Sequence, residues 1–263
     1  GGGPSFRATN VHNLLDQLPL RSPDAMKDLQ EVSFTEILDV LETLGQALDF
    51  ETNAHIREAY AAGLAASNYP PSLLKNSYLT LPLAFKRAAV HEIAEQRIGI
   101  RYLEGWVEEK LSDGRLLRIR AFGSRALHIP AGNGGLVSAI SIIRNAITRS
   151  DAIIKAPAND PLTAMAIGRT PADIAPNHAL TRHLSVAYWR GGDTDFEAKL
   201  LRPEHIEKVI AWGGFASVKH ITRYLQPGLE LIALDPKRSA TIIGPEAFED
   251  ETTLQEVARR AAC

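Results

Sequence analysis

The sequence predicts an α/β protein with a doubly wound parallel sheet, preceded by a helical region and a β-hairpin. Residues 126–244 alternate short apolar runs with helix-like segments, which is the pattern of βαβ units in a parallel sheet. Residues 1–104 instead place their apolar side chains at helical spacing. Between these regions, residues 105–125 change to a strand pattern on either side of a tight-turn pair. Together the three patterns predict the fold class and the order of its parts.

The N-terminal region, residues 1–104, is predicted to hold three main helices. Ser33 or Thr35 can cap the first, because six apolar side chains follow on one helical face: Phe34, Ile37, Leu38, Leu41, Leu44 and Leu48. A second helix covers residues 53–66 and ends where prolines interrupt the chain at positions 70 and 71. A third runs from Pro82 to about Ile98.

The segment at 105–125 is predicted to form a β-hairpin. Its arms are residues 106–111 and 115–120, and they flank the favoured turn pair Asp113-Gly114. Because the arms carry many charges, the hairpin is not expected at the centre of a sheet. We expect an edge feature, or an arm that pairs with another subunit in a homo-oligomer.

The α/β region is expected to contain a series of strands followed by helices. The predicted strands are 126–131, 152–155, 185–189, 209–212, 229–234 and 240–243. Helices should open after 133–135, near Asp160-Pro161, and at 216–224. This region, 126–245, is predicted to be one dinucleotide-binding domain. Residues 246–263 read as a single helix that begins a further domain.

Composition narrows the classes of function. The net charge is −2, and no basic stripe indicates nucleic acid binding. No apolar run is long enough to cross a bilayer. Cys263 is the one cysteine, so a disulfide within the chain is impossible, which fits a reducing cytoplasm. The histidines are scattered and no HExxH or GxSxG motif occurs, so we predict neither a metal site nor a serine hydrolase.

Four loops that follow predicted strands are candidates for chemistry, since ligands of doubly wound sheets bind beyond the carboxyl ends of the strands. They are 129–135, 155–161, 211–218 and 234–239. Each also has a purely structural interpretation. Asn133 can be a helix N-cap, Lys155 a lysine at the sheet rim, Gly213-Gly214 a tight turn, and 235–239 a solvated connection. No single loop decides between the two interpretations.

The order and spacing of the four loops are typical of aldehyde dehydrogenases, and within that superfamily the chain closely resembles the LuxC-type acyl-CoA reductases. Those enzymes supply fatty aldehyde in bacterial bioluminescence. The match covers about half of the chain. It is carried by HIPAGNGG at 128–135, IIKAPANDPLTA at 153–164, LTRHLSVAYWRGGD at 180–193, AWGGFASVKHI at 211–221 and LDPKRSATIIG at 234–244.

The resemblance implies a Rossmann-like NADP domain and a reductase mechanism. A cysteine thiolate takes the acyl group from CoA or an acylated protein, NADPH delivers hydride, and fatty aldehyde leaves. Asn133 would then lie in the oxyanion hole, and Lys155 would hold the adenosine ribose. The other implied cofactor contacts are Ile129, Pro130 and Ala131 at the nicotinamide, Gly213, Gly214 and Phe215 under the pyrophosphate, and Trp212 and Val218 beside it.

Position 158 bears on the choice of cofactor. NAD-preferring relatives often carry a glutamate three residues after the lysine, where it binds ribose hydroxyls and repels a 2′-phosphate. This chain has Ala158 there, next to the positive Lys155. The resemblance therefore implies NADPH.

Two departures from the superfamily pattern are visible. Leu234 stands where a glutamate general base is typical, which is consistent with a reductase that does not activate water. In the family the nucleophile follows the helix at 246–263, so Cys263, within a helical run, is only a secondary candidate for it. We therefore expect this chain to be the cofactor-binding portion of a longer enzyme. Its expected partners are fatty acyl-CoA or an acylated protein, such as an acyltransferase or synthetase.

Two alternatives stay open at this point. One is an NAD-dependent aldehyde dehydrogenase of another subfamily, which Ala158 and Leu234 disfavour. The other is a non-catalytic module that binds nucleotides or takes part in assembly.

Overall fold

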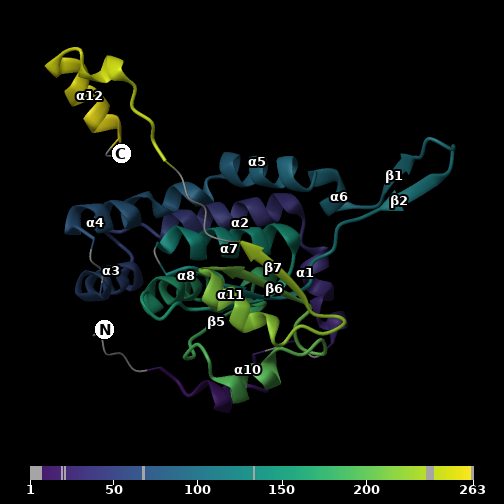
Figure 1. The fold of residues 1–263 in the computed structure, drawn as a ribbon. Coiled ribbons are helices and arrows are strands. Elements are labelled where there is room, and N and C mark those ends of the chain that lie inside the picture. Colours follow the sequence, from purple (N-terminus) through teal and green to yellow (C-terminus); the bar gives the residue numbers. More distant parts are fainter. Residues whose placement is uncertain are drawn as a thin grey trace.

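A five-stranded parallel sheet forms the centre of the computed structural model, which describes residues 8–18, 20, 22–66, 69–132, 134–234 and 240–261 (Figure 1). Its strands are β3 (Arg125–Ile129), β4 (Asp151–Lys155), β5 (Leu184–Ala187), β6 (Lys208–Trp212) and β7 (Glu230–Leu234). The strand order is β5-β4-β3-β6-β7. From β3, the chain adds β4 and then β5 on one side. It then crosses back to add β6 and β7 on the other side of β3. This topology confirms the predicted doubly wound sheet and puts its switch point between β3 and β6.

Helices cover both faces of this sheet (Figure 1). One face packs on α7 (Gly135–Thr148) and α8 (Pro161–Ile174), and the other on α10 (Thr194–Leu200) and α11 (Phe215–Thr222). The short α9 (Ala179–Arg182) precedes β5. Successive side chains of a strand point to opposite faces, so Ile153 and Ile154 of β4 belong to different hydrophobic clusters. Each face thus has its own core.

The N-terminal helices form an outer layer on the α7–α8 side and share its core. They are α1 (Lys27–Glu31), α2 (Phe34–Ala47), α3 (Ala54–Ala66), α4 (Pro71–Thr80), α5 (Arg87–Arg97) and α6 (Ile100–Glu104), with the short 3₁₀ turns η2 (Pro23–Met26) and η3 (Leu81–Phe85). The turn η1 (Val11–Leu14) instead packs on the α10–α11 face, where Val11 belongs to the other core cluster. The capped first helix is confirmed. Ser33 Oγ accepts a hydrogen bond from the Glu36 N–H at 3.1 Å, and all six predicted apolar side chains are buried.

The predicted helix over 53–66, ending before Pro70-Pro71, is confirmed as α3. The next helix was missed and the third is wrong as predicted: Pro71 is the first residue of α4, which the sequence pattern did not predict. Proline suits that position because the first N–H groups of a helix have no partner within it. The helix expected from Pro82 to Ile98 is instead η3 followed by α5, because Lys86 has an extended backbone (φ −58°, ψ 133°).

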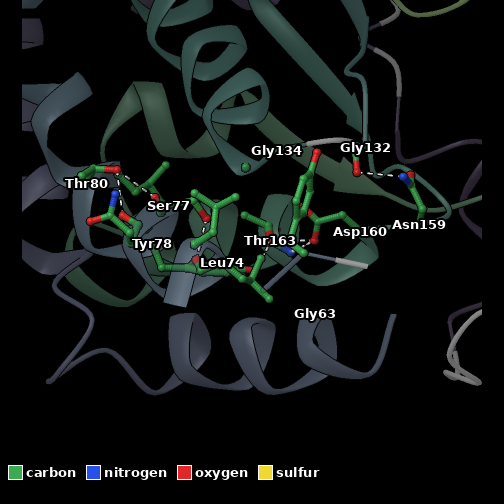
Figure 2. A pocket seen from close by; sticks show the side chains of 15 residues that line it. Gly63, Leu74, Ser77, Tyr78, Thr80, Gly132, Gly134, Asn159, Asp160 and Thr163 are labelled. Carbon is green, nitrogen blue, oxygen red and sulfur yellow. Dashed lines mark hydrogen bonds between the residues drawn. The ribbon is translucent and has the colours of Figure 1, made fainter. Parts of the chain in front are cut away.

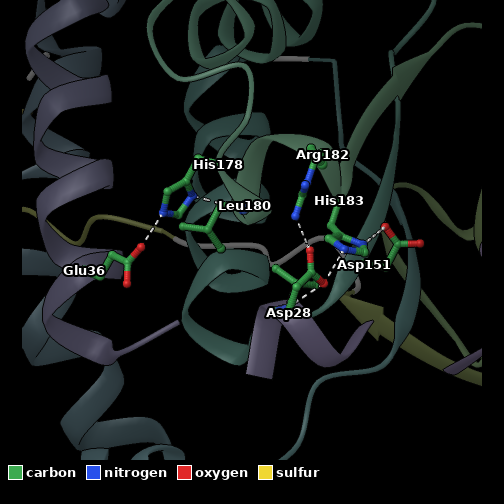
Figure 3. Close-up of polar contacts among 8 residues, drawn as sticks. Asp28, Glu36, Asp151, His178, Leu180, Arg182 and His183 are labelled. Carbon is green, nitrogen blue, oxygen red and sulfur yellow. Dashed lines mark hydrogen bonds and ion pairs between the residues drawn. The ribbon is translucent and has the colours of Figure 1, made fainter. Parts of the chain in front are cut away.

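An ion-pair cluster ties the N-terminal layer to the amino ends of the strands (Figure 3). The His183 ring lies between two carboxylates, with Nε2 2.9 Å from Asp28 Oδ1 and Nδ1 3.3 Å from Asp151 Oδ1. Asp28 also accepts a hydrogen bond from Arg182. Asp28 lies on α1 and Asp151 begins β4, so the imidazole links a helix of the outer layer to the sheet.

The hairpin is confirmed as β1 (Val107–Lys110) paired antiparallel with β2 (Leu116–Ile119), with Val107 opposite Ile119. It forms a separate two-stranded sheet and projects away from the body of the molecule (Figure 1). Neither strand is buried. Pairing with another subunit stays a prediction.

The carboxyl-terminal part differs from the sequence prediction in three details. β5 ends at Ala187, before Trp189. Residues 240–243 form no strand; apolar residues alone do not make one without a neighbouring strand to pair with, and Ile242 is 94% exposed. The helix expected over 246–263 is the turn η4 (Pro245–Phe248) followed by α12 (Glu251–Ala261), which lies apart from the sheet (Figure 1).

Candidate cofactor site

A cavity of about 340 Å³ lies at the carboxyl ends of β3, β4 and β6, on the α10–α11 face of the sheet. Five residues predicted to contact the cofactor line it: Ile129, Lys155, Trp212, Gly213 and Val218. They come from three strands, one turn and one helix, and they are as far apart in sequence as positions 129 and 218. The fold therefore brings them together at the switch point, where doubly wound sheets bind their ligands.

The other predicted contacts lie elsewhere or outside the described residues. Pro130, Ala131, Ala158, Gly214 and Phe215 do not line this cavity. The Phe215 side chain is 76% exposed, and Ala158 is also exposed. Asn133, Cys263 and the loop 235–239 are outside the part of the chain that the structure describes. The position directly before α7 is Gly134, so the N-cap role considered for Asn133 falls on a glycine.

The start of α11 forms one wall of the cavity and is open to a ligand. Gly214 is the N-cap residue, and a Cβ added to it would meet nothing within 4 Å. A Cβ on Gly213 would touch only Ser217, at 3.6 Å. The first N–H groups of a helix lack helical partners and favour an anion. A phosphate group can therefore approach this backbone closely.

Lys155 supplies a cation at the end of β4. Its Nζ lies 5.2 Å from the centre of the Trp189 ring, in cation–π geometry. Burial lowers the pKa of Lys155, and the nearby carboxylate of Glu197 acts in the opposite direction. The ammonium is thus partly withdrawn from water and supported by an aromatic face and an acid.

Glu197 is a cavity residue that sequence reasoning missed. It lies on α10, lines the cavity and is 2% exposed. Its neighbours Phe196 and Leu200 on the same helix are fully buried. A charged residue on the apolar face of a short amphipathic segment is the signal that could have identified it.

A second cavity, of about 420 Å³, lies on the opposite face of the sheet, between α4 and the starts of α7 and α8 (Figure 2). Leu73, Leu74 and Leu81 give it an apolar wall. Gly132, Gly134 and Gly135 line it too, whereas Ile129 lines the first cavity. Residues close in the chain after β3 therefore line both cavities.

The polar side of the second cavity is a hydrogen-bonded chain of three residues (Figure 2). Tyr78 Oη lies 2.7 Å from Thr163 Oγ1, which donates to Asp160 Oδ1 at 2.6 Å. Burial raises the pKa of Tyr78 to about 12 and also raises the pKa of Asp160. Asp160 is also the N-cap of α8 and accepts from the Thr163 N–H. The chain therefore fixes α4 against the start of α8.

Two kinds of ligand site are not found among the described residues. No group of three His, Cys, Asp or Glu side chains there could hold a metal ion. No helix in that part of the chain is long and apolar enough to cross a membrane.

Solved structures identify the class of fold. The NADP-dependent glyceraldehyde-3-phosphate dehydrogenase from Bacillus halodurans C-125, complexed with NADP, superposes with a TM-score of 0.65 at 13% identity, covering 84% of this chain and 44% of that one. An aldehyde dehydrogenase from Brucella melitensis biovar abortus 2308 gives 0.63 at 13% identity, covering 88% and 44%. The fold is that of the aldehyde dehydrogenases.

Sequence comparison identifies the family. The model of the LuxC acyl-CoA reductases matches residues 29–263, so this chain belongs to that family and the predicted resemblance is confirmed. The long-chain acyl-protein thioester reductase of Vibrio harveyi is 29% identical over 227 residues, which is 85% of this chain and 46% of that protein. The reductase of the same name from Photorhabdus luminescens is 27% identical over 251 residues, 91% of this chain and 49% of that protein. The chain thus spans about half the length of these relatives.

Proposed function

We propose that this chain is the cofactor-binding portion of an NADPH-dependent reductase that converts long-chain acyl thioesters, on CoA or on a protein, into fatty aldehydes. The observation that carries the proposal is the cavity at the switch point, where five residues predicted to contact the cofactor converge. Relatives named acyl-protein thioester reductases support the substrate class.

The residues around the cavity fit a dinucleotide phosphate. The bare glycines at 213–214 and the start of α11 suit a pyrophosphate, since a side chain there would keep it from the backbone N–H groups. Lys155 is placed to donate to ribose or 2′-phosphate oxygens, and Ala158 adds no competing carboxylate. Bound NADPH would supply hydride to an acyl thioester. The side chains of this chain bind and orient the cofactor, and Ile129 lines the cavity at the end of β3.

The second cavity is the proposed place for part of the acyl group. It lies on the opposite face of the sheet from the cofactor cavity and is lined by Gly132, Gly134 and Gly135, which follow Ile129 of the cofactor cavity in the chain, so substrate and cofactor would approach neighbouring residues from two faces. Its leucines offer an apolar surface to an alkyl chain. Asp160 and Tyr78, whose pKa values burial raises, both bond to Thr163 on the polar side of this cavity.

Cofactor binding by a lysine variant tests the proposal. Lys155→Ala should weaken NADPH binding about tenfold or more, because a charge-assisted hydrogen bond is lost. Trp189 and Trp212 border the cavity, so energy transfer from tryptophan to NADPH reports the binding. Lys110→Ala, on the exposed strand β1, is the matched control and should bind as the unaltered chain does.

NADH gives the second arm of this test. The unaltered chain should bind NADPH more tightly than NADH, and Lys155→Ala should remove most of that difference, since the 2′-phosphate loses its positive partner. Full NADPH affinity in Lys155→Ala would overturn the role of the lysine. No binding of either nucleotide by the unaltered chain would overturn the proposed cofactor site.

A further inference from the structure

Glu197 is a buried carboxylate in the wall of the cofactor cavity. It belongs to α10, an element to which the family resemblance assigns no cofactor contact, and it is 2% exposed. Moving a carboxylate out of water is unfavourable unless hydrogen bonds and opposite charges compensate for the lost hydration. The structure should therefore show what compensates Glu197.

Three donors from two sides of the cavity meet this carboxylate. Trp189 Nε1 donates to Oε1 at 3.2 Å, and Tyr224 Oη donates to Oε2 at 3.1 Å. His220 Nε2 lies 2.5 Å from Oε2. Trp189 follows β5, whereas His220 lies on α11 and Tyr224 follows it. Glu197 consequently joins α10, α11 and the end of β5 at a single point.

The same indole connects Glu197 to Lys155. The Trp189 indole donates its N–H to the Glu197 carboxylate, and the Lys155 ammonium lies over the face of the same ring, 5.2 Å from its centre. A hydrogen bond from the indole N–H to an anion increases the electron density of the ring and so strengthens its attraction for a cation. The ionisable groups that line the cavity with Lys155 are Glu197 from α10 and His220 from α11. The charge of Glu197 also opposes the lowering of the Lys155 pKa by burial.

We propose that Glu197 is a positioning residue of the cofactor cavity: it fixes the Trp189 ring beneath Lys155 and holds α11 in place, so that the ammonium meets the dinucleotide in a fixed position. The identity of the ligand rests on the proposed function. The link from Glu197 through Trp189 to Lys155 does not, and it can be tested without any cofactor.

The first experiment measures the titration of Lys155 directly. Lysines are labelled by reductive ¹³C-methylation and followed by NMR from about pH 6 to about pH 11, a range that brackets lysine titration. The Lys155 signal is the one absent from Lys155→Arg. Glu197→Gln keeps the shape and an acceptor for Trp189 but removes the charge, so the Lys155 midpoint should move to lower pH. Glu197→Asp keeps the charge, so its Lys155 midpoint should lie close to that of the unaltered chain.

A carboxylate elsewhere provides the control for this titration. Glu230→Gln removes the same charge at the sheet edge, where Glu230 pairs with Lys208, and should leave the Lys155 midpoint unchanged. An unchanged Lys155 midpoint in Glu197→Gln would overturn the inference. A similar movement in Glu230→Gln would also overturn it, because the effect would then come from net charge.

The second experiment measures NADPH binding across the same pH range. At the acid end of the range, Glu197→Gln should bind NADPH nearly as well as the unaltered chain does. As the pH rises, Glu197→Gln should lose its affinity for NADPH at a lower pH than the unaltered chain. For each pH unit by which the Lys155 midpoint moves, the part of the NADPH affinity that depends on the Lys155 charge should change roughly tenfold. Failure of the unaltered chain to bind NADPH would count against the proposed function, while the NMR titration would still decide the role of Glu197. If the unaltered chain binds NADPH but the Lys155 midpoint does not move in Glu197→Gln, the proposed role of Glu197 is wrong and the proposed function still stands.

Discussion

Single residues show how burial changes chemistry that the sequence alone cannot reveal. Lys155 was a candidate from its position at the end of an apolar strand, the family resemblance implied its role, and the structure shows that it lines the cavity. Glu197 was not identified, because its importance comes from three donors that lie 8, 23 and 27 residues away in the chain. Sequence pattern predicts which strand ends meet, but it does not predict which side chains of a following helix turn inward.

His183 makes the stability of this chain dependent on pH. Its hydrogen bond to Asp151 is the largest of the effects that raise its pKa, burial acts against it, and Asp28 adds to the increase. The raised pKa means that the folded state binds this proton more tightly than the unfolded state. The stabilisation is therefore complete below the ordinary histidine pKa and is lost as pH rises through the folded value.

Urea unfolding at a series of pH values measures this contribution. The free energy of unfolding should fall as pH rises above about 6.5, by about 1.4 kcal/mol for each pKa unit of displacement. His183→Asn should abolish that slope. His205→Gln is the control, because the His205 ring bonds to the uncharged Lys199 carbonyl, and this substitution should leave the slope in place. A slope that survives in His183→Asn would show that other groups cause it.

At the scale of elements, the sequence predicted the parallel strands well because each is a short apolar run bounded by turn residues. It failed where a local rule has two outcomes. Pro71 can end one helix or begin another, and it begins α4, whose Tyr78 and Leu74 line the second cavity. The apolar run 240–243 fits a strand by composition, but strand formation requires a partner, and none lies among the described residues.

Close packing of α2 against η3 depends on a glycine. A Cβ at Gly45 would lie 2.6 Å from Phe85 Cβ, so Gly45→Ala must push the two elements apart. We expect a loss of about 1–3 kcal/mol in the free energy of unfolding, despite the higher helix propensity of alanine. Thermal or urea unfolding measures it.

Gly63 on α3 provides the comparison for Gly45. A Cβ there would meet the end of the flexible Leu74 side chain at 3.3 Å, which can move. Gly63→Ala should therefore be neutral or stabilising by up to about 1 kcal/mol. Equal effects of the two substitutions would refute the claim that backbone approach at Gly45 is the cause.

At the scale of the whole molecule, two cavities lie on opposite faces of one sheet, with Ile129 lining one and Gly132, Gly134 and Gly135 lining the other. The sheet topology puts these residues at the switch point, and α3 and α4 of the N-terminal layer contribute Gly63, Leu73 and Leu74 to the second cavity. The cofactor half of this arrangement was predictable, because strand ends and glycine turns are local signals. The second cavity was not, since it needs the packing of α4 onto α7 and α8.

The central claim is that the cavity between β3, β4 and β6 receives NADPH. A crystal structure of this chain grown with NADPH tests it most directly. We predict the pyrophosphate at Gly213-Gly214, the adenosine ribose and its 2′-phosphate within hydrogen-bonding distance of Lys155, and the nicotinamide beside Ile129. A nucleotide bound instead in the cavity between α4 and α8, or on any other surface, would contradict the account.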